Sequence, residues 1–178
     1  VHFLDFLRDS YGWDKLKEKV TVPLSGFKVA PYYGCTLVRP KNVALDRPDN
    51  PRLLHEFLEA LGAEAVDFPS AIECCGSYQI LGNPEGALRM SHGILSDATR
   101  HGAEALALAC PLCDYNMSRR QDAMIGKFED AADVPVYYFT QLLAVALGVS
   151  PEAARLDMNR ESARNLLTQK QFITAASA

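Results

Sequence analysis

The fold of this 178-residue chain is decided by the stretch Ala105-Leu106-Ala107-Leu108-Ala109-Cys110-Pro111-Leu112-Cys113. Its first five residues are small or aliphatic without interruption, which is typical of a strand buried on both faces of a sheet. A C-x-x-C pair follows where that strand ends. The sequence therefore places two thiols at the carboxyl end of a buried strand.

Two other predicted strands also lead to cysteines. The apolar and aromatic run Phe27–Tyr33 is followed by Cys35, and a short strand at Ala65–Phe68 leads into the Cys74-Cys75-Gly76 loop. The three cysteine-bearing segments thus share one position relative to their strands.

Helical periodicity fills the segments between these strands. Asn50-Pro51 offers an N-cap residue and a first-turn proline, and Gly62 ends the helix that they start. Asn83-Pro84 repeats the same signal, and Gly102 ends that second helix. The apolar residues of both helices recur at intervals of three and four: Leu54, Phe57, Leu58 and Leu61 in the first, and Ala87, Met90, Ile94 and Ala98 in the second.

The remaining chain continues this alternation. Asp114–Phe128 is predicted to be helical, Val134–Phe139 to be a strand, and Thr140 to cap the helix that follows. Residues 1–22 and 150–178 are expected to form a helical lead-in and a helical tail.

Strands that alternate with helices in this way are typical of βαβ units. The sequence therefore predicts an α/β fold with a mostly parallel, doubly wound sheet and helices on both faces. Sites in such sheets form at the carboxyl edge of the strands. We expect all five thiols to meet there, at a metal site.

Composition and charge exclude several classes of partner. The chain is 48% hydrophobic and 22% charged, with a formal net charge of -4, which suits a single globular domain. It has no cluster of Lys and Arg, so no nucleic acid or anionic membrane partner is expected. Its apolar stretches are shorter than the roughly 18 residues of a membrane span, and no signal peptide is evident. We expect a cytoplasmic protein, and the start at Val1 within a helical pattern predicts a fragment of a longer chain.

The five cysteines favour metal or redox chemistry. An odd number cannot pair completely within the chain, and nothing indicates secretion. The C-x-x-C segment sets Cys110 and Cys113 on the same side of a bend, as sites that grip iron or zinc require. The adjacent Cys74 and Cys75 suit a cluster whose irons lie apart better than a single tetrahedral ion, and Gly76 frees the backbone beside them. Helix starts after Cys113 and near Cys75 are expected to point backbone N–H groups at the sulfurs.

The cysteine pattern resembles a known family. Cys35, Cys74-Cys75-Gly76 and Cys110-Pro111-Leu112-Cys113 resemble the cysteine-rich CCG module, and the intervening segments, 36–73 and 76–109, contain 38 and 34 residues. Residues 29–35, Val-Ala-Pro-Tyr-Tyr-Gly-Cys, and the run at residues 109–113 are similar to the second, C-terminal half of the heterodisulfide reductase B subunit. The likeness extends from about Val1 to beyond Gln121.

This resemblance implies a function and a set of partners. In the family, all five cysteines bind a noncubane [4Fe-4S] cluster, and two facing modules reduce a disulfide between their clusters by one-electron steps. Electrons arrive from a ferredoxin-like C subunit that is fed by a flavin-containing A subunit. One module is present here, so this chain alone is expected to be an incomplete oxidoreductase subunit whose N-terminal module is missing. The module also resembles parts of glycolate- and lactate-oxidising complexes and an unusual succinate dehydrogenase subunit, which leaves the substrate open.

Three alternatives explain some of the cysteines. A zinc ion held by four of the five thiols would make the chain a structural or interaction domain without catalysis of its own, and an isolated domain could also leave its site empty. Cys110 and Cys113 could be buried structural cysteines, or a thioredoxin-like dithiol. Neither of these last two explanations accounts for Cys35, Cys74 and Cys75.

Other residues carry weaker signals. Arg39 and Lys41 follow Cys35 and either meet an anionic group of a substrate or remain solvated. Tyr32, Tyr33 and Tyr78 flank the cysteine loops and either wall the site or pack in the core. The residues Asn83-Pro84-Glu85-Gly86 form a turn and helix cap rather than a phosphate loop. The histidines are expected to pack at or near the surface without a chemical role: His2, His55, His92 and His101.

Overall fold

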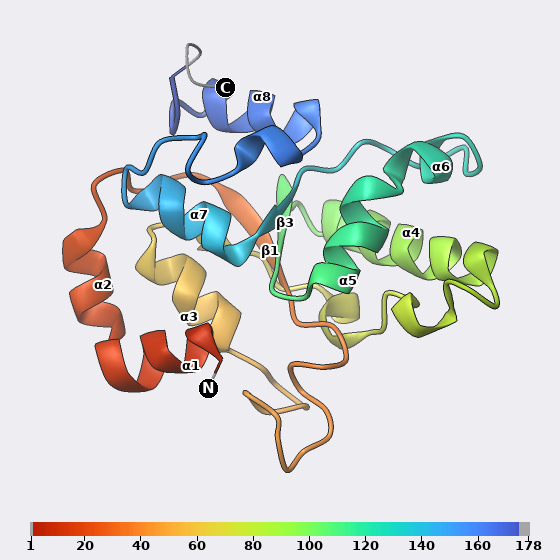
Figure 1. The fold of residues 1–178 in the computed structure, drawn as a ribbon, viewed down its shortest axis with the longest axis horizontal. Helices are drawn as coiled ribbons and strands as arrows, with labels where there is room; N and C mark the ends of the chain where they lie inside the picture. Colours follow the sequence, from red (N-terminus) through yellow and green to blue (C-terminus); the bar gives the residue numbers. More distant parts are fainter. Residues whose placement is uncertain (1, 175–178) are drawn as a thin grey trace.

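The computed structural model describes residues 2–174 and contains a parallel sheet between two helical layers (Figure 1). The strands lie in the order β2-β1-β3-β4. Their bounds are Lys28–Tyr32 for β1, Glu64–Ala65 for β2, Ala105–Leu108 for β3 and Val136–Tyr138 for β4. The predicted α/β fold with a parallel sheet is confirmed.

The helical elements have the following bounds: α1 Phe3–Asp5, η1 Phe6–Tyr11, α2 Trp13–Lys19, α3 Leu53–Ala60, η2 Pro69–Ile72, η3 Ser77–Gln79, α4 Pro84–Arg100, α5 Pro111–Asp114, η4 Tyr115–Arg119, α6 Gln121–Ile125, α7 Phe139–Ala146, η5 Leu156–Met158 and α8 Glu161–Gln169. The elements η1 and η4 are π-helices, and the other η elements are 3-10 turns. Within residues 2–174, no helix combines the length and the apolar character that crossing a bilayer requires. Residues 175–178 of the predicted tail lie outside the described residues.

The two faces of the sheet bury separate hydrophobic clusters. Alternate residues of β1 and β3 point to opposite faces, so that Val29 and Ala107 join one cluster while Ala30 and Leu106 join the other. The first cluster lies against α1, α2, α3, α7 and α8, and the second lies against α4, η4 and α6. Figure 1 shows these two groups of helices on either side of the strands. The doubly wound arrangement with helices on both faces is confirmed.

The switch point of the sheet topology lies between β1 and β3. These strands are neighbours, and the chain leaves β1 toward α3 on one face but leaves β3 toward α5 on the other. In open α/β sheets, such a switch point is where binding sites form. Two of the three cysteine segments follow these two strands.

The strand β2 is shorter than the predicted strand Ala65–Phe68. The N–H groups of Glu64 and Val66 donate to the carbonyls of Phe27 and Val29, so every second residue of β1 points its backbone polar groups toward β2. The next β1 residue on that edge is Pro31, which has no N–H to offer. Pairing therefore stops after Ala65, and the chain diverges toward η2.

The predicted start of α3 at Asn50-Pro51 is wrong, because residues outside that dipeptide supply the cap. The helix begins at Leu53, and the carboxylate of Asp46 accepts the N–H groups of Arg52 and Leu53. The Tyr33 hydroxyl accepts the next two, from Leu54 at 3.0 Å and His55 at 3.4 Å. These side chains satisfy the N–H groups that a helix start leaves without partners.

Tyr33→Phe is expected to reduce the free energy of unfolding by about 1–3 kcal/mol, because it leaves buried N–H groups without an acceptor. The hydroxyl also lies 2.8 Å from Nδ1 of His55, so a second buried polar group loses its partner. Urea denaturation of metal-free protein measures the difference. The matched control is Tyr78→Phe, at a ring that is 75% exposed, and equal stability losses in both variants would contradict this capping role.

Two other helix starts differ from the prediction, whereas one is confirmed. Thr140 does not cap α7; the helix starts at Phe139, and the Gln141 side chain accepts the N–H of Tyr138. The helix predicted from Asp114 starts earlier, at Pro111, and its second turn is the π-helix η4. Asn83 caps α4 as predicted, with its side chain accepting the N–H of Gly86 at 2.8 Å.

Candidate metal centre

The loop that carries Cys35 is fastened to the segment that leads to the other cysteine loop. The N–H groups of Tyr33 and Gly34 both donate to the carbonyl of Ala71, at 2.9 and 3.1 Å. Ala71 belongs to η2, which ends two residues before Cys74. The end of β1 thus fixes the approach of Cys74 to Cys35, and these two thiols contact one another.

The Cys74-Cys75 loop is held by its backbone. Gly76 takes a left-handed conformation with φ of +81°, and its N–H donates to the Cys74 sulfur at 3.3 Å. On the other side, the Ser91 hydroxyl of α4 donates to the carbonyl of Cys75 at 2.9 Å. The two adjacent side chains diverge: Cys75 is buried and Cys74 is half-buried.

The C-x-x-C segment is the first turn of a helix rather than a bend before one. Cys110 occupies the N-cap position of α5 and Cys113 lies in its first turn, so the expected helix start after Cys113 is corrected by three residues. Pro111 at the first helical position fits because that N–H is not needed there. The N–H groups of Leu112 and Cys113 consequently point at the Cys110 sulfur.

The structure brings the five predicted cysteines to one place at the carboxyl edge of β1 and β3. The sulfur atoms of Cys75 and Cys113 lie 3.3 Å apart. Cys113 also contacts the Cys110 side chain, and Cys35 contacts Cys74. The three loops therefore meet through contacts of Cys35 with Cys74 and of Cys113 with Cys75 and Cys110, and Cys75 and Cys113 are buried.

The electrostatics of this group favour thiolates. Cys113 keeps its proton and interacts with both neighbours, which lowers the pKa of Cys75 to about 6 and the pKa of Cys110 to about 5. The same two interactions, together with burial, raise the pKa of Cys113. Burial and the Cys74 thiol raise the pKa of Cys35. The lowered pKa values favour the thiolate form, which is the form that binds metal, at Cys75 and Cys110.

The flanking aromatic and basic residues divide between the site and other parts of the chain. Tyr32 is buried, its hydroxyl donates to the carbonyl of Glu73 at 2.7 Å, and its ring borders the sulfurs. Tyr33 points to the opposite face, toward α3, and Tyr78 is exposed. Arg39 and Lys41 are exposed, and the Arg39 guanidinium lies 3.3 Å from the carbonyl of Ile72.

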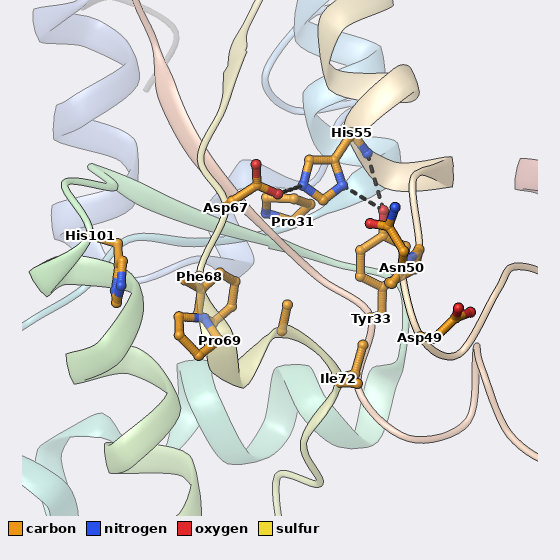
Figure 2. A pocket seen from close by; sticks show the side chains of 12 residues that line it. Pro31, Tyr33, Asp49, Asn50, His55, Asp67, Phe68, Pro69, Ile72 and His101 are labelled. Atoms are coloured by element: carbon orange, nitrogen blue, oxygen red, sulfur yellow. Dashed lines mark hydrogen bonds and ion pairs between the residues drawn. The ribbon is translucent and has the colours of Figure 1, made fainter.

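His55 is more deeply buried than the expected surface or partly buried packing, because this side chain is 4% exposed and belongs to a hydrogen-bonded network. Its Nε2 lies 2.7 Å from the Asp67 carboxylate, and its Nδ1 faces Tyr33. Figure 2 shows these contacts at the edge of a cavity of about 440 Å³ beside Pro31, where β1 and the chain after β2 diverge. Arg52 also contacts Asp67, so the His55 and Asp67 side chains at this cavity already have partners. The other histidines are at least partly exposed: His2, His92 and His101.

Several residues that touch the cysteines were not predicted, among them Ser77 beside Cys75 and Thr36 beside Cys110. The buried Asn116 side chain of η4 donates to the carbonyl of Cys75 at 3.2 Å and lies 3.7 Å from its sulfur. Its position three residues after Cys113 on a helix is a signal that places both on one face. Ser91 carries no comparable signal, because it reaches Cys75 from a different helix.

The donor set fits soft metals. Cysteine thiolates are the usual ligands of iron–sulfur clusters and of structural zinc. In the part of the chain that the structure describes, no group of three Cys, His, Asp or Glu side chains is arranged around a point suited to one metal ion. The closest contacts of the thiols are those of Cys35 with Cys74 and of Cys113 with Cys75 and Cys110.

Comparison with known proteins identifies the cysteine segments. The model of the cysteine-rich (CCG) domain family matches residues 29–118, which are 90 of the 178 residues. A solved structure of a hypothetical protein from Helicobacter pylori shares the fold, with a TM-score of 0.63 at 14% identity over 83% of this chain and 27% of that one.

Curated relatives share more of the sequence. The chain is 35% identical to the B subunit of the Ferredoxin:CoB-CoM heterodisulfide reductase of Methanosarcina mazei, over 89% of this chain and 53% of that protein. It is 33% identical to the 8-methylmenaquinol:fumarate reductase membrane anchor subunit of Wolinella succinogenes, over 82% of this chain and 52% of that protein. The chain spans about half the length of these relatives. It therefore belongs to the cysteine-rich CCG domain family, as a homologue of the heterodisulfide reductase B subunit and of related reductase subunits.

Proposed function

We propose that Cys35, Cys74, Cys75, Cys110 and Cys113 hold a noncubane [4Fe-4S] cluster, and that the chain is a disulfide-reducing, electron-transfer module of a heterodisulfide-reductase-like B subunit. The observation that carries this proposal is the convergence of five thiols from three loops in contacting pairs. Adjacent sulfurs at Cys74 and Cys75 that diverge, one buried and one half-buried, suit metal ions at different positions. When bound, the cluster supplies one-electron steps.

The five cysteines are proposed to have different roles in the site. Cys75 and Cys113 lie in the core and keep water from the inner side of the centre. Cys35, Cys74 and Cys110 are half-buried, so these three are proposed to lie on the side from which a substrate approaches. The first-turn N–H groups of α5 stabilise negative charge on Cys110. Cys113 must release its proton when it binds metal, so occupancy is expected to fall at low pH.

The reaction proposed is the reduction of a disulfide to two thiols, which consumes two electrons and two protons. The relatives' printed names support this substrate class, and we propose a low-molecular-weight disulfide for this chain. A ferredoxin-like C subunit, fed by a flavin-containing A subunit, is the proposed electron donor. A second CCG module is proposed to complete the substrate site.

The test is anaerobic purification followed by iron, sulfide and zinc analysis and EPR spectroscopy of oxidised and thiol-treated protein. About four irons and four sulfides per chain, with an EPR signal that changes on adding thiol, are the expected result. One zinc and no iron, even after anaerobic reconstitution, would contradict the cluster and support a structural zinc domain.

A further inference from the structure

Asn116 lies beside the cysteines in an unusual backbone segment. It belongs to the π-helix η4, which follows α5 directly, and its side chain is 1% exposed. A π-turn inside a helix is rare and is found mostly at functional sites. The turn sets Asn116 next to Cys75, a residue 41 positions away in the sequence.

The contacts of the Asn116 amide indicate a role at the Cys75 sulfur rather than a role in the stability of the fold. Its Nδ2 lies 3.2 Å from the Cys75 carbonyl and 3.7 Å from the Cys75 sulfur. Among the described residues, its Oδ1 is buried without a hydrogen-bond partner. The opposite orientation of the amide would set two acceptors, Oδ1 and the Cys75 carbonyl, against each other. A buried acceptor without a partner lowers stability, so a leucine of similar size would serve packing alone at least as well.

The Cys75 carbonyl does not depend on Asn116. The Ser91 hydroxyl donates to the same oxygen at 2.9 Å from the opposite side. The contact that Asn116 makes and Ser91 does not is the one with the sulfur. Both residues hold the Cys75 loop in place, but of the two only Asn116 also contacts the Cys75 thiolate.

We propose that Asn116 is a positioning residue that donates its Nδ2–H to the Cys75 sulfur and so raises the reduction potential of the centre that the five cysteines hold. The inference rests on the proposed function. Reduction adds negative charge that is shared by the cysteine sulfurs, and a fixed donor in a buried environment stabilises that charge. Hydrogen bonds to the sulfurs are among the factors that set such potentials.

Asn116→Leu tests this role by an EPR-monitored redox titration of the anaerobically loaded protein. Loss of the donor is expected to shift the potential in the negative direction. A tenfold fall in the ratio of reduced to oxidised centre at a fixed ambient potential corresponds to about 59 mV for a one-electron couple. We expect a shift of about that size, with the iron content of wild type and with unchanged or slightly increased thermal stability of the metal-free protein.

Ser91→Ala is the matched control, because it removes a hydrogen bond to the same carbonyl without touching the sulfur. It is expected to keep the wild-type potential, and a shift equal to that of Asn116→Leu would overturn the proposal. Should Asn116→Leu fail to fold, Asn116→Val, which is closer in volume to asparagine, also removes the donor and adds no charge; a wild-type potential in that variant would also overturn the proposal. The iron content of wild type tests the proposed function separately, whereas differences among iron-loaded proteins test Asn116.

Discussion

Cys75→Ser is expected to reduce the iron content from about four per chain to less than one, the largest effect of any single substitution at the site. Cys75 is 1% exposed, its sulfur lies 3.3 Å from that of Cys113, and Ser91 and Asn116 hold its carbonyl. A serine oxygen is a harder, more basic donor than a thiolate and is a poor ligand for an iron–sulfur cluster. Because these contacts fix the position of the loop, the backbone cannot shift to bring another side chain into the place of the Cys75 ligand.

The measurement is iron and sulfide content after anaerobic reconstitution, with urea denaturation of the metal-free variant as its control. The metal-free variant is expected to unfold within about 1 kcal/mol of wild type, since the side chain changes little in size. Ser91→Ala retains all five thiols and should keep its iron. Full iron occupancy in Cys75→Ser would show that Cys75 is not a ligand and that four cysteines suffice.

Gly76→Ala is expected to destabilise the protein by about 3 kcal/mol or more, in the presence or absence of metal. A Cβ at Gly76 would lie 2.6 Å from Cα of Ala87, closer than real Cβ contacts, and the obstacle is the backbone of α4. The left-handed conformation, with φ of +81°, adds about 1–2 kcal/mol for any residue with a Cβ. Relief of the clash requires the Cys74-Cys75 loop to move away from α4, so metal binding should weaken as well.

Substitutions at two other glycines distinguish the backbone strain at Gly76 from the steric clash with Ala87. Gly102 has φ of +89° and nothing within 4 Å of an added Cβ, so Gly102→Ala isolates the backbone strain and should cost about 1–2 kcal/mol. Gly93 lies inside α4 with open space around it, and Gly93→Ala should stabilise the helix by up to about 1 kcal/mol. Urea denaturation of the three variants gives the comparison. A loss at Gly76 no greater than that at Gly102 would show that the approach to Ala87 is not tight.

The sequence alone determined the parts of the fold that depend on local signals. Asn83-Pro84 marks the start of α4 correctly because the cap is a contact between residues three apart. The strands at Lys28–Tyr32 and Ala105–Leu108 were evident from continuous apolar runs. The position of each cysteine segment after a parallel strand also predicted their convergence, because the carboxyl ends of parallel strands share one edge.

Tertiary structure alone decided the features that depend on residues far apart. The start of α3 was mispredicted in part because Tyr33, a residue of the chain after β1, accepts N–H groups of its first turn. The pairing of Cys75 with Cys113, and the contact of Asn116 with the Cys75 sulfur, depend on how α4 and η4 pack against the cysteine loops. Local patterns report a residue's own neighbours along the chain, whereas these contacts are set by packing between elements that the sequence separates by tens of residues.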